Sequence, residues 1–269
     1  MTDQAYIHEI EAARQQAQQE LTASPINWLS LVGLFWFQRG QNTFGSAPDN
    51  DFILASAPEH AGAFHFNDGA VTFQPADGQV ITNNGAPLEP RPLRADRDRL
   101  ELGTLALTVI LRGDETLLRI WDKNAPTYKN FTALKYFPVN PAFRIEADFV
   151  RFEHPRRMSV LDAIGTLSER TFLGEVHFEV DGVKCQLIAQ ESGELLHFNF
   201  LDATSGESSY PAGRELNVPK PDGDSVALDF NLAENWPCAY TKFATCPVPR
   251  PENRLPVRIE AGEMKYFEK

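Results

Sequence analysis

The sequence has few of the features that assign a function directly. Its 269 residues include only three cysteines, and basic residues are fewer than acidic ones, 25 against 37. The most apolar run, WLSLVGLFWF at 28–37, is about half the length that a membrane-spanning helix needs. The amino end has neither the basic stretch nor the apolar core of a signal peptide. We therefore expect a cytoplasmic protein with reduced cysteines.

The net charge and the missing motifs argue against several classes of function. A formal net charge of −12 repels phosphate backbones and anionic lipids, so we expect neither nucleic acid nor a membrane as a partner. The chain has no G-x-S-x-G elbow, no Walker loop and no G-x-G-x-x-G fingerprint. Cys238 and Cys246 have no histidine or further cysteine between them, unlike the paired ligands of structural zinc. We expect no metal and no cofactor.

What the sequence does contain is a helical start followed by many short strands. In residues 3–21, apolar side chains recur every three or four positions, which predicts an amphipathic helix that ends before Pro25. From Trp28 onward, short apolar or alternating runs are separated by turn signals such as NDG (67–69) and NNG (83–85). The fold class predicted is all-β, with an amino-terminal helix, a β-sandwich and a second antiparallel β-domain.

The same pattern of strands and turn signals predicts the domain boundaries. We expect the helix and a connection at 1–27, the sandwich at 28–123, a crossing segment with central prolines at 124–150, and the second β-domain at 151–269. In the second domain, alternating strands flank Asp181-Gly182, which is a preferred two-residue hairpin turn.

Residues 40–54, GQNTFGSAPDNDFIL, resemble the opening of a forkhead-associated domain, a β-sandwich that reads phosphothreonine. In that fold an arginine follows the glycine of a Gly-Arg pair, and a Ser-x-x-His turn comes later. Here Ser46 follows Gly45, and Ala57 stands where the serine before His60 would be. Because phosphate recognition needs a guanidinium fork, the resemblance implies a sandwich without phosphopeptide binding.

Longer strings resemble a widespread prokaryotic family of uncharacterised proteins, known as a domain of unknown function. They are WLSLVGLFWF with GQNTFGS, then FNFLDATSGESSYPAGREL, and last ALDFNLAENWPCAYTKFATCPVPRPENRLPVRIEAGE. The resemblance spans nearly the whole chain, and its pattern is concentrated in the last third. It implies family membership and transfers no activity.

A proline-rich segment, PCAYTKFATCPVPRPENRLP at 237–256, contains two of the three cysteines. Its prolines predict a stiff, extended excursion that loses little entropy when it orders. We interpret its cysteines as small apolar groups that pack the segment on the core. Whether Cys238 and Cys246 are structural or reactive stays open on the sequence.

Polar and aromatic side chains gather in and around this segment, and we predict that they line a ligand site. The candidate ligand-binding residues are Asp202, Tyr210, Arg214, Asp229, Asn231, Trp236, Tyr240, Glu252, Asn253, Arg254, Glu260 and Glu263. Such groups would suit a small polar ligand, a sugar or a carboxylate metabolite. Two of the carboxylates could also act as an acid–base pair in a metal-independent hydrolase, so enzymatic status stays open. The alternative is a protein-interaction module that binds an unmodified protein partner through the degenerate sandwich.

Overall fold

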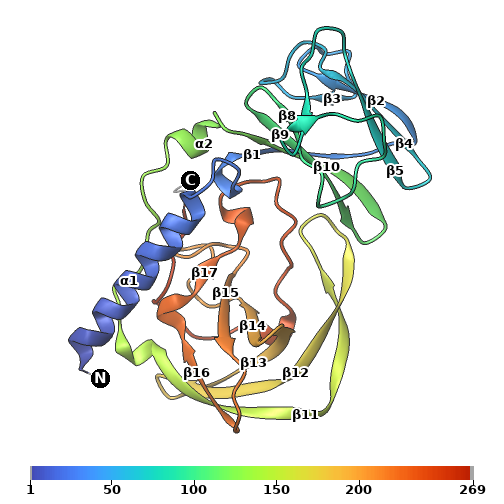
Figure 1. The fold of residues 1–269 in the computed structure, drawn as a ribbon. Helices are drawn as coiled ribbons and strands as arrows, with labels where there is room; N and C mark the ends of the chain where they lie inside the picture. Colours follow the sequence, from blue (N-terminus) through green and yellow to red (C-terminus); the bar gives the residue numbers. More distant parts are fainter. Residues whose placement is uncertain (1, 267–269) are drawn as a thin grey trace. The chain divides into compact units, whose positions relative to one another are not determined.

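The computed structural model describes residues 2–266, and in this range the protein is mostly β with a helix at its amino end, as the sequence predicts (Figure 1). The chain divides into two compact units. Unit 1 comprises Met1–Leu21 and Thr132–Lys269, and unit 2 comprises Thr22–Phe131. Unit 2 is therefore inserted into the sequence of unit 1. The junction at Phe131–Thr132 lies inside the expected crossing segment 124–150, and the amino-terminal helix belongs to unit 1.

Unit 2 contains two β-sheets that share one hydrophobic core. The six-stranded sheet has the order β1 (Leu31–Trp36), β10 (Glu115–Asp122), β9 (Leu105–Arg112), β8 (Leu100–Leu102), β6 (Thr82–Asn83) and β7 (Ala86–Pro87). The four-stranded sheet has the order β3 (Phe52–Ile53), β2 (Gly40–Gly45), β4 (Gly62–Asn67) and β5 (Ala70–Pro75). The flanking short helices are η1 (Trp28–Ser30) and α2 (Pro126–Lys129). Paired strands are antiparallel except β2 and β3.

Two-residue turns and phenylalanine packing explain why this stretch forms short strands. Asp68-Gly69 joins β4 to β5, and Asn84-Gly85 joins β6 to β7. All four turn residues have positive φ angles, as a type I′ turn requires, and both turns occur where the sequence predicts them. In the core, the buried rings of Phe64 and Phe73 have centres 4.4 Å apart. Burial of such rings contributes favourably to the stability of the unit.

Unit 1 is built on one seven-stranded antiparallel sheet. Its order is β16 (Ser225–Asp229), β11 (Arg144–Leu161), β12 (Leu167–Val180), β13 (Val183–Ser192), β14 (Leu195–Phe200), β15 (Arg214–Pro219) and β17 (Glu234–Asn235). The predicted hairpin is confirmed, with Val180 of β12 paired to Val183 of β13 across Asp181-Gly182. Apolar side chains of these strands share one core with Leu255 and Ile259 of the C-terminal segment.

Two strands of unit 1 lie in stretches for which no strand is predicted from the sequence. β11 begins at Arg144, inside the expected crossing segment, and β15 begins at Arg214, inside the polar stretch that precedes the proline-rich segment. In β15 the buried positions Arg214, Leu216 and Val218 alternate with more exposed ones. The sequence therefore has the alternation of a strand here, but the charged Arg214 occupies the first inward position.

Helix α1 (Asp3–Thr22) contacts unit 1 through hydrogen bonds as well as apolar side chains. Tyr6 is buried, and its hydroxyl donates to the carboxylate of Asp229, 2.8 Å from each oxygen. Arg14 donates to the backbone oxygens of Asn231, at 3.0 Å, and Phe137, at 2.9 Å. No helix within residues 2–266 is both long and apolar enough to cross a membrane.

Beyond β17 the described backbone is mostly irregular and is interrupted by two short 3₁₀ turns. The turns of unit 1 are η2 (Pro141–Phe143), η3 (Phe230–Leu232), η4 (Pro237–Ala239) and η5 (Pro251–Asn253). η4 and η5 begin with proline, whose fixed φ suits the first position of a helical turn. The proline-rich segment therefore alternates turns with extended backbone, where the sequence predicts one extended excursion.

Candidate functional site

The structure divides the candidate ligand-binding residues into three groups by exposure. The buried group is Asp202, Arg214, Asn231, Tyr240, Asn253 and Glu263. The half-buried group is Tyr210, Asp229 and Trp236, and the exposed group is Glu252, Arg254 and Glu260. Their partners show that they belong to several separate regions of unit 1. Asp229 and Asn231, for example, hold α1, as described above.

Arg214 is fully buried and fixes the C-terminal segment to β15. Its guanidinium donates to the backbone oxygens of Ile259 at 2.8 Å, of Glu263 at 3.3 Å, and of Ala261. It also forms an ion pair with Asp202, at 3.2 Å. Burial lowers the pKa of Arg214, and the negative charge of Asp202 opposes this effect. The two terminal nitrogens of the guanidinium are thus paired, whereas its Nε is buried without a hydrogen-bond partner among the described residues. A buried cation is tolerated when most of its donors are paired in this way.

The carboxylate of Asp202 is also used within the fold. It accepts a hydrogen bond from the backbone N–H of Ile259 at 2.7 Å and another from the hydroxyl of Thr204 at 2.8 Å. We name Arg214, Asp202 and the backbone of residues 259–263 the arginine clamp. Because its charged groups already bind one another and the backbone, the clamp is structural and offers little to a ligand.

Glu263 connects the clamp to the proline-rich segment. Its carboxylate accepts from the hydroxyl of Tyr240 at 2.6 Å and from the backbone N–H of Asn235 at 2.8 Å. These hydrogen bonds favour the ionised form, but burial outweighs them and raises the pKa of Glu263 to about 7. Burial and the nearby Glu263 also raise the pKa of Tyr240.

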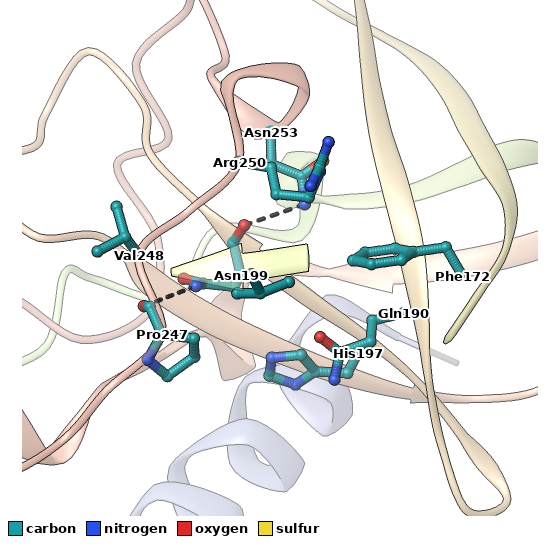
Figure 2. A pocket seen from close by; sticks show the side chains of 9 residues that line it. Phe172, Gln190, His197, Asn199, Pro247, Val248, Arg250 and Asn253 are labelled. Atoms are coloured by element: carbon teal, nitrogen blue, oxygen red, sulfur yellow. Dashed lines mark hydrogen bonds between the residues drawn. The ribbon is translucent and has the colours of Figure 1, made fainter. Parts of the chain in front are cut away.

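Asn199 and Asn253 organise another buried polar region (Figure 2). Asn253 accepts from the backbone N–H of Ile188 at 2.7 Å and donates to the backbone oxygen of Asn199 at 3.0 Å. Asn199 donates to the backbone oxygen of Pro247 at 2.9 Å and accepts from the indole N–H of Trp236 at 2.8 Å. The cavity beside them has a volume of about 10 Å³, which is room for about one water molecule. It is too small for a metabolite.

The exposed candidates do not converge with the buried ones. Glu252 pairs with Arg250 at 3.0 Å, and Glu260 pairs with Arg258 at 2.8 Å. Arg254 faces solvent. Ion pairs between exposed side chains are screened by solvent and contribute little to stability.

A much larger pocket lies beside the proline-rich segment. Its volume of about 750 Å³ is within the range of roughly 300–1,000 Å³ found for small-molecule sites. Its lining includes Tyr210, Cys238, Tyr240, Lys242, Lys265 and Tyr266, and the other lining residues are small or uncharged. Among the described residues 2–266, the lining thus has two lysines and no carboxylate, in a chain with 37 acidic and 25 basic residues. We name it the lysine pocket.

Cys238 lines the lysine pocket, and Cys246 lies next to Cys238 in the fold. The backbone N–H of Cys238 donates to Sγ of Cys246 at 3.2 Å, and both thiols are free. Cys246 is 6 % exposed, whereas Cys238 is only half-buried. A hydrogen bond from the Cys246 thiol lowers the pKa of Cys238, although burial opposes it. That hydrogen bond, together with burial, raises the pKa of Cys246. The accessible thiol is therefore the one that ionises more easily.

A smaller pocket beside β15 and β17 contains two carboxylates that the sequence analysis does not single out. Glu215 and Glu234 are cross-strand partners, and the pocket they line has a volume of about 210 Å³. Burial, followed by the charge of Glu234, raises the pKa of Glu215 to about 7. Across residues 2–266, no group of three or more His, Cys, Asp or Glu side chains is placed to hold a metal ion.

The family model described as a protein of unknown function (DUF1684) matches residues 129–264. The chain belongs to the DUF1684 family. This confirms the family of unknown function predicted from the strings of the last third. The DUF1684 match does not extend over nearly the whole chain, however, and the strings between residues 28 and 46 lie outside it. The resemblance of residues 28–123 to a forkhead-associated domain is not confirmed.

Among solved structures, the chain is similar to an uncharacterized protein from gene locus rrnAC0354 of Haloarcula marismortui, determined by NMR in solution. The two share 30% sequence identity over 52% of this chain and 80% of that chain, with a TM-score of 0.45. No curated protein matches the chain. Membership of DUF1684 therefore brings no activity with it, and the function has to be argued from the geometry.

The candidate residues predicted from the sequence and the residues that line the lysine pocket overlap only in part. Tyr210 and Tyr240 are candidate ligand-binding residues and line the pocket, whereas Lys242, Lys265 and Tyr266 were not singled out. A signal for Lys242 was available, because it lies between the two cysteines of the proline-rich segment in a chain that has few basic residues. No local signal links Lys265 and Tyr266 to that segment, since the fold alone brings them there.

Proposed function

We propose that unit 1 of this DUF1684 protein binds a small carboxylate metabolite in the lysine pocket. The observation that carries the proposal is the charge of the lining. Its described residues include Lys242 and Lys265 and no carboxylate, in a chain with a net charge of −12. A concave site lined by one sign of charge concentrates ligands of the opposite sign. The acidic remainder of the protein disfavours anion binding elsewhere.

The tyrosine rings supply a preorganised surface for the carbon skeleton of such a ligand. The ring centres of Tyr240 and Tyr266 lie 5.3 Å apart in an edge-to-face arrangement. The hydroxyl of Tyr240 is held by Glu263, and the hydroxyl of Tyr210 donates to the backbone oxygen of Cys238 at 2.7 Å. Because these side chains are already fixed, little conformational entropy is lost when a ligand packs on them.

The lining favours a carboxylate over a sugar, and binding over hydrolysis. Sugar hydroxyls need acceptors as well as donors, whereas the charged groups here are two ammonium groups, which only donate. A hydrolase needs a general base within reach of its substrate, and the part of the lining that the structure describes contains no histidine or carboxylate. We therefore propose ligand binding without hydrolysis.

Isothermal titration calorimetry with a set of di- and tricarboxylates and neutral sugars of similar size tests the proposal. We expect carboxylate binding that weakens at least about tenfold in the Lys242→Ala/Lys265→Ala variant, since a hydrogen bond to a charged group contributes about 1.5–3 kcal/mol. Lys184→Ala removes an exposed lysine of β13 and is the matched control, with unchanged affinity expected. Equal affinities for the double variant and the control, or binding of sugars alone, would contradict the proposal.

We propose protein interaction through unit 2 as a second candidate function. Trp36 at the end of β1 is 39 % exposed, and it lines a pocket of about 340 Å³ together with Asp51 and Phe52. β1 and β3 are edge strands of their sheets, and an extended peptide can add to such an edge by main-chain hydrogen bonds. A stoichiometric partner that Trp36→Ala loses and Lys242→Ala/Lys265→Ala retains in a pull-down supports this function. A partner retained by both variants contradicts it.

A further inference from the structure

Cys238 and Cys246 are placed for a reaction that ligand binding alone does not require. Sγ of Cys246 accepts a hydrogen bond from the backbone N–H of Cys238 at 3.2 Å, so the two residues are neighbours in the fold. Their surroundings differ, because Cys238 lines a pocket of about 750 Å³ whereas Cys246 is 6 % exposed and is not part of the lining. An accessible thiol beside a buried one is the arrangement of an attacking and a resolving cysteine.

We propose that Cys238 and Cys246 form a dithiol that reduces low-molecular-weight disulfides bearing carboxylates, with Cys238 as the attacking thiol and Cys246 as the resolving thiol. The substrate would occupy the lysine pocket, so the inference rests on the proposed function for its substrate class. Lys242 and Lys265 would hold the carboxylates of the disulfide, and its sulfur atoms would lie at Cys238.

The reaction proceeds in two exchanges. The thiolate of Cys238 attacks one sulfur of the bound disulfide, which forms a mixed disulfide at Cys238 and releases the first half of the substrate as a thiolate. The thiolate of Cys246 then attacks Sγ of Cys238, which forms the Cys238–Cys246 disulfide and releases the second half. Two protein thiols are oxidised and one small disulfide is reduced to two thiols, which take up the protons that the cysteines lose.

The order of attack follows from the electrostatics of the pair. Before the first exchange, the hydrogen bond from Cys246 favours the thiolate of Cys238, and the charge of that thiolate keeps Cys246 protonated. The mixed disulfide removes the charge from Cys238, so this barrier to ionising Cys246 disappears. The backbone N–H of Cys238 still points at Sγ of Cys246 and stabilises the new thiolate.

Closing the disulfide would also change the pocket. Thr241, Lys242 and Ala244 line the pocket and lie in the loop between the two cysteines. A bond between the ends of that loop restricts its conformations. Oxidation of the pair would therefore alter the affinity of the lysine pocket for its ligand.

Mass spectrometry of the reduced protein after exposure to oxidised glutathione tests the dithiol. We expect the wild type to lose only its two thiol hydrogens, whereas Cys246→Ser should accumulate one glutathione adduct at Cys238 and Cys238→Ser should accumulate none. Cys246→Ala replaces the serine variant if the buried hydroxyl impairs folding. Cys185→Ser removes the remaining buried cysteine and should behave as the wild type. Failure of both Cys246 variants to form an adduct would overturn the inference, as would a first adduct at Cys185.

The charge of the probe separates this inference from the proposed function. Oxidised glutathione should react at least about tenfold faster than cationic cystamine, with neutral hydroxyethyl disulfide between them, and Lys242→Ala/Lys265→Ala should abolish the difference. Equal rates for the three probes in the wild type would overturn the assignment of substrate class. If carboxylates bind and depend on the lysines but no adduct forms at Cys238, the dithiol is wrong and the proposed function stands.

Discussion

The arginine clamp and the lysine pocket both place cations in unit 1, but they use the charge in opposite ways. In the clamp, the guanidinium of Arg214 is bonded to backbone oxygens and to Asp202, and the residue is 0 % exposed. In the pocket, Lys242 and Lys265 line an open volume of about 750 Å³. Arg214 holds two parts of the chain together, whereas Lys242 and Lys265 face space that a ligand can enter.

The difference shows what separates a site from a structural network. Both regions are dense in polar residues, and that density is why the sequence predicts a site in the last third of the chain. Density alone does not identify a site, because buried polar groups are normally hydrogen-bonded within the protein. The deciding observation is whether the charged groups are already matched. In the clamp, the terminal nitrogens of Arg214 are paired with Asp202 and with backbone oxygens, which makes stability and binding separable by mutation.

The largest effect is expected from Arg214→Met, which removes the charge and keeps an apolar stem. It leaves Asp202 buried without its partner and the backbone of residues 259–263 without donors. We expect the free energy of unfolding to fall by about 3–5 kcal/mol, measured by urea denaturation. Arg254→Ala removes an exposed arginine as the control and should change it by less than about 0.5 kcal/mol. Similar losses in both variants would contradict the clamp.

An intermediate effect is expected at Glu263, which contacts both regions. Its pKa is about 7 in the folded protein, against an ordinary value of 4.5, so the folded state binds more protons than the unfolded chain between these values. The associated stability is fully present below about pH 4.5 and is lost as the pH rises through 7. We expect the loss of unfolding free energy over this pH range to be smaller in Glu263→Gln, by on the order of 1–3 kcal/mol. Urea denaturation midpoints measured across the same range test this expectation.

Two other glutamates sharpen this prediction. Glu215 also has its pKa raised to about 7 by burial, so a smaller decline should remain in Glu263→Gln. The pKa of exposed Glu252 is lowered by its hydrogen bond to Arg250, so Glu252→Gln should leave the decline between pH 4.5 and 7 unchanged. A decline of wild-type size in Glu263→Gln would show that the buried carboxylate is not its source.

The smallest effect on stability is expected from Lys242→Ala. The side chain is exposed and lines the pocket, so its removal should change the free energy of unfolding by less than about 0.5 kcal/mol. Thermal unfolding without ligand measures this change, and the titration described above measures binding. A loss comparable to that of Arg214→Met would place Lys242 in a structural network and remove the contrast between the two regions.

The parts of the fold that local signals specify were predictable from the sequence. The helical periodicity of residues 3–21 corresponds to α1, and Asp181-Gly182 forms the expected turn between β12 and β13. β15 was missed because its first inward residue is Arg214, whose backbone partners lie 45–49 residues further along the chain. No local pattern reveals that a charged side chain will be matched at such a separation.

The candidate site was predictable only as a region. Asp202, Arg214 and Glu263 do come together, but they form a structural clamp, and the exposed Glu252 and Glu260 point elsewhere. A prediction by residue type selects groups that can bind a ligand and cannot tell which of them the fold has already used. Tertiary packing decides that point, so the pocket lining had to come from the structure.

Unit 1 is assembled from two stretches of chain with all of unit 2 between them, so translation makes its pieces at different times. Tyr6 of α1 is synthesised 223 positions before its partner Asp229. At roughly 5–20 residues per second, this interval is on the order of 10–40 seconds. Unit 2 is one continuous stretch and is made within the interval, so it can fold on the ribosome while α1 has no partner. Unit 1 cannot close until residues 259–263 have emerged to meet Arg214.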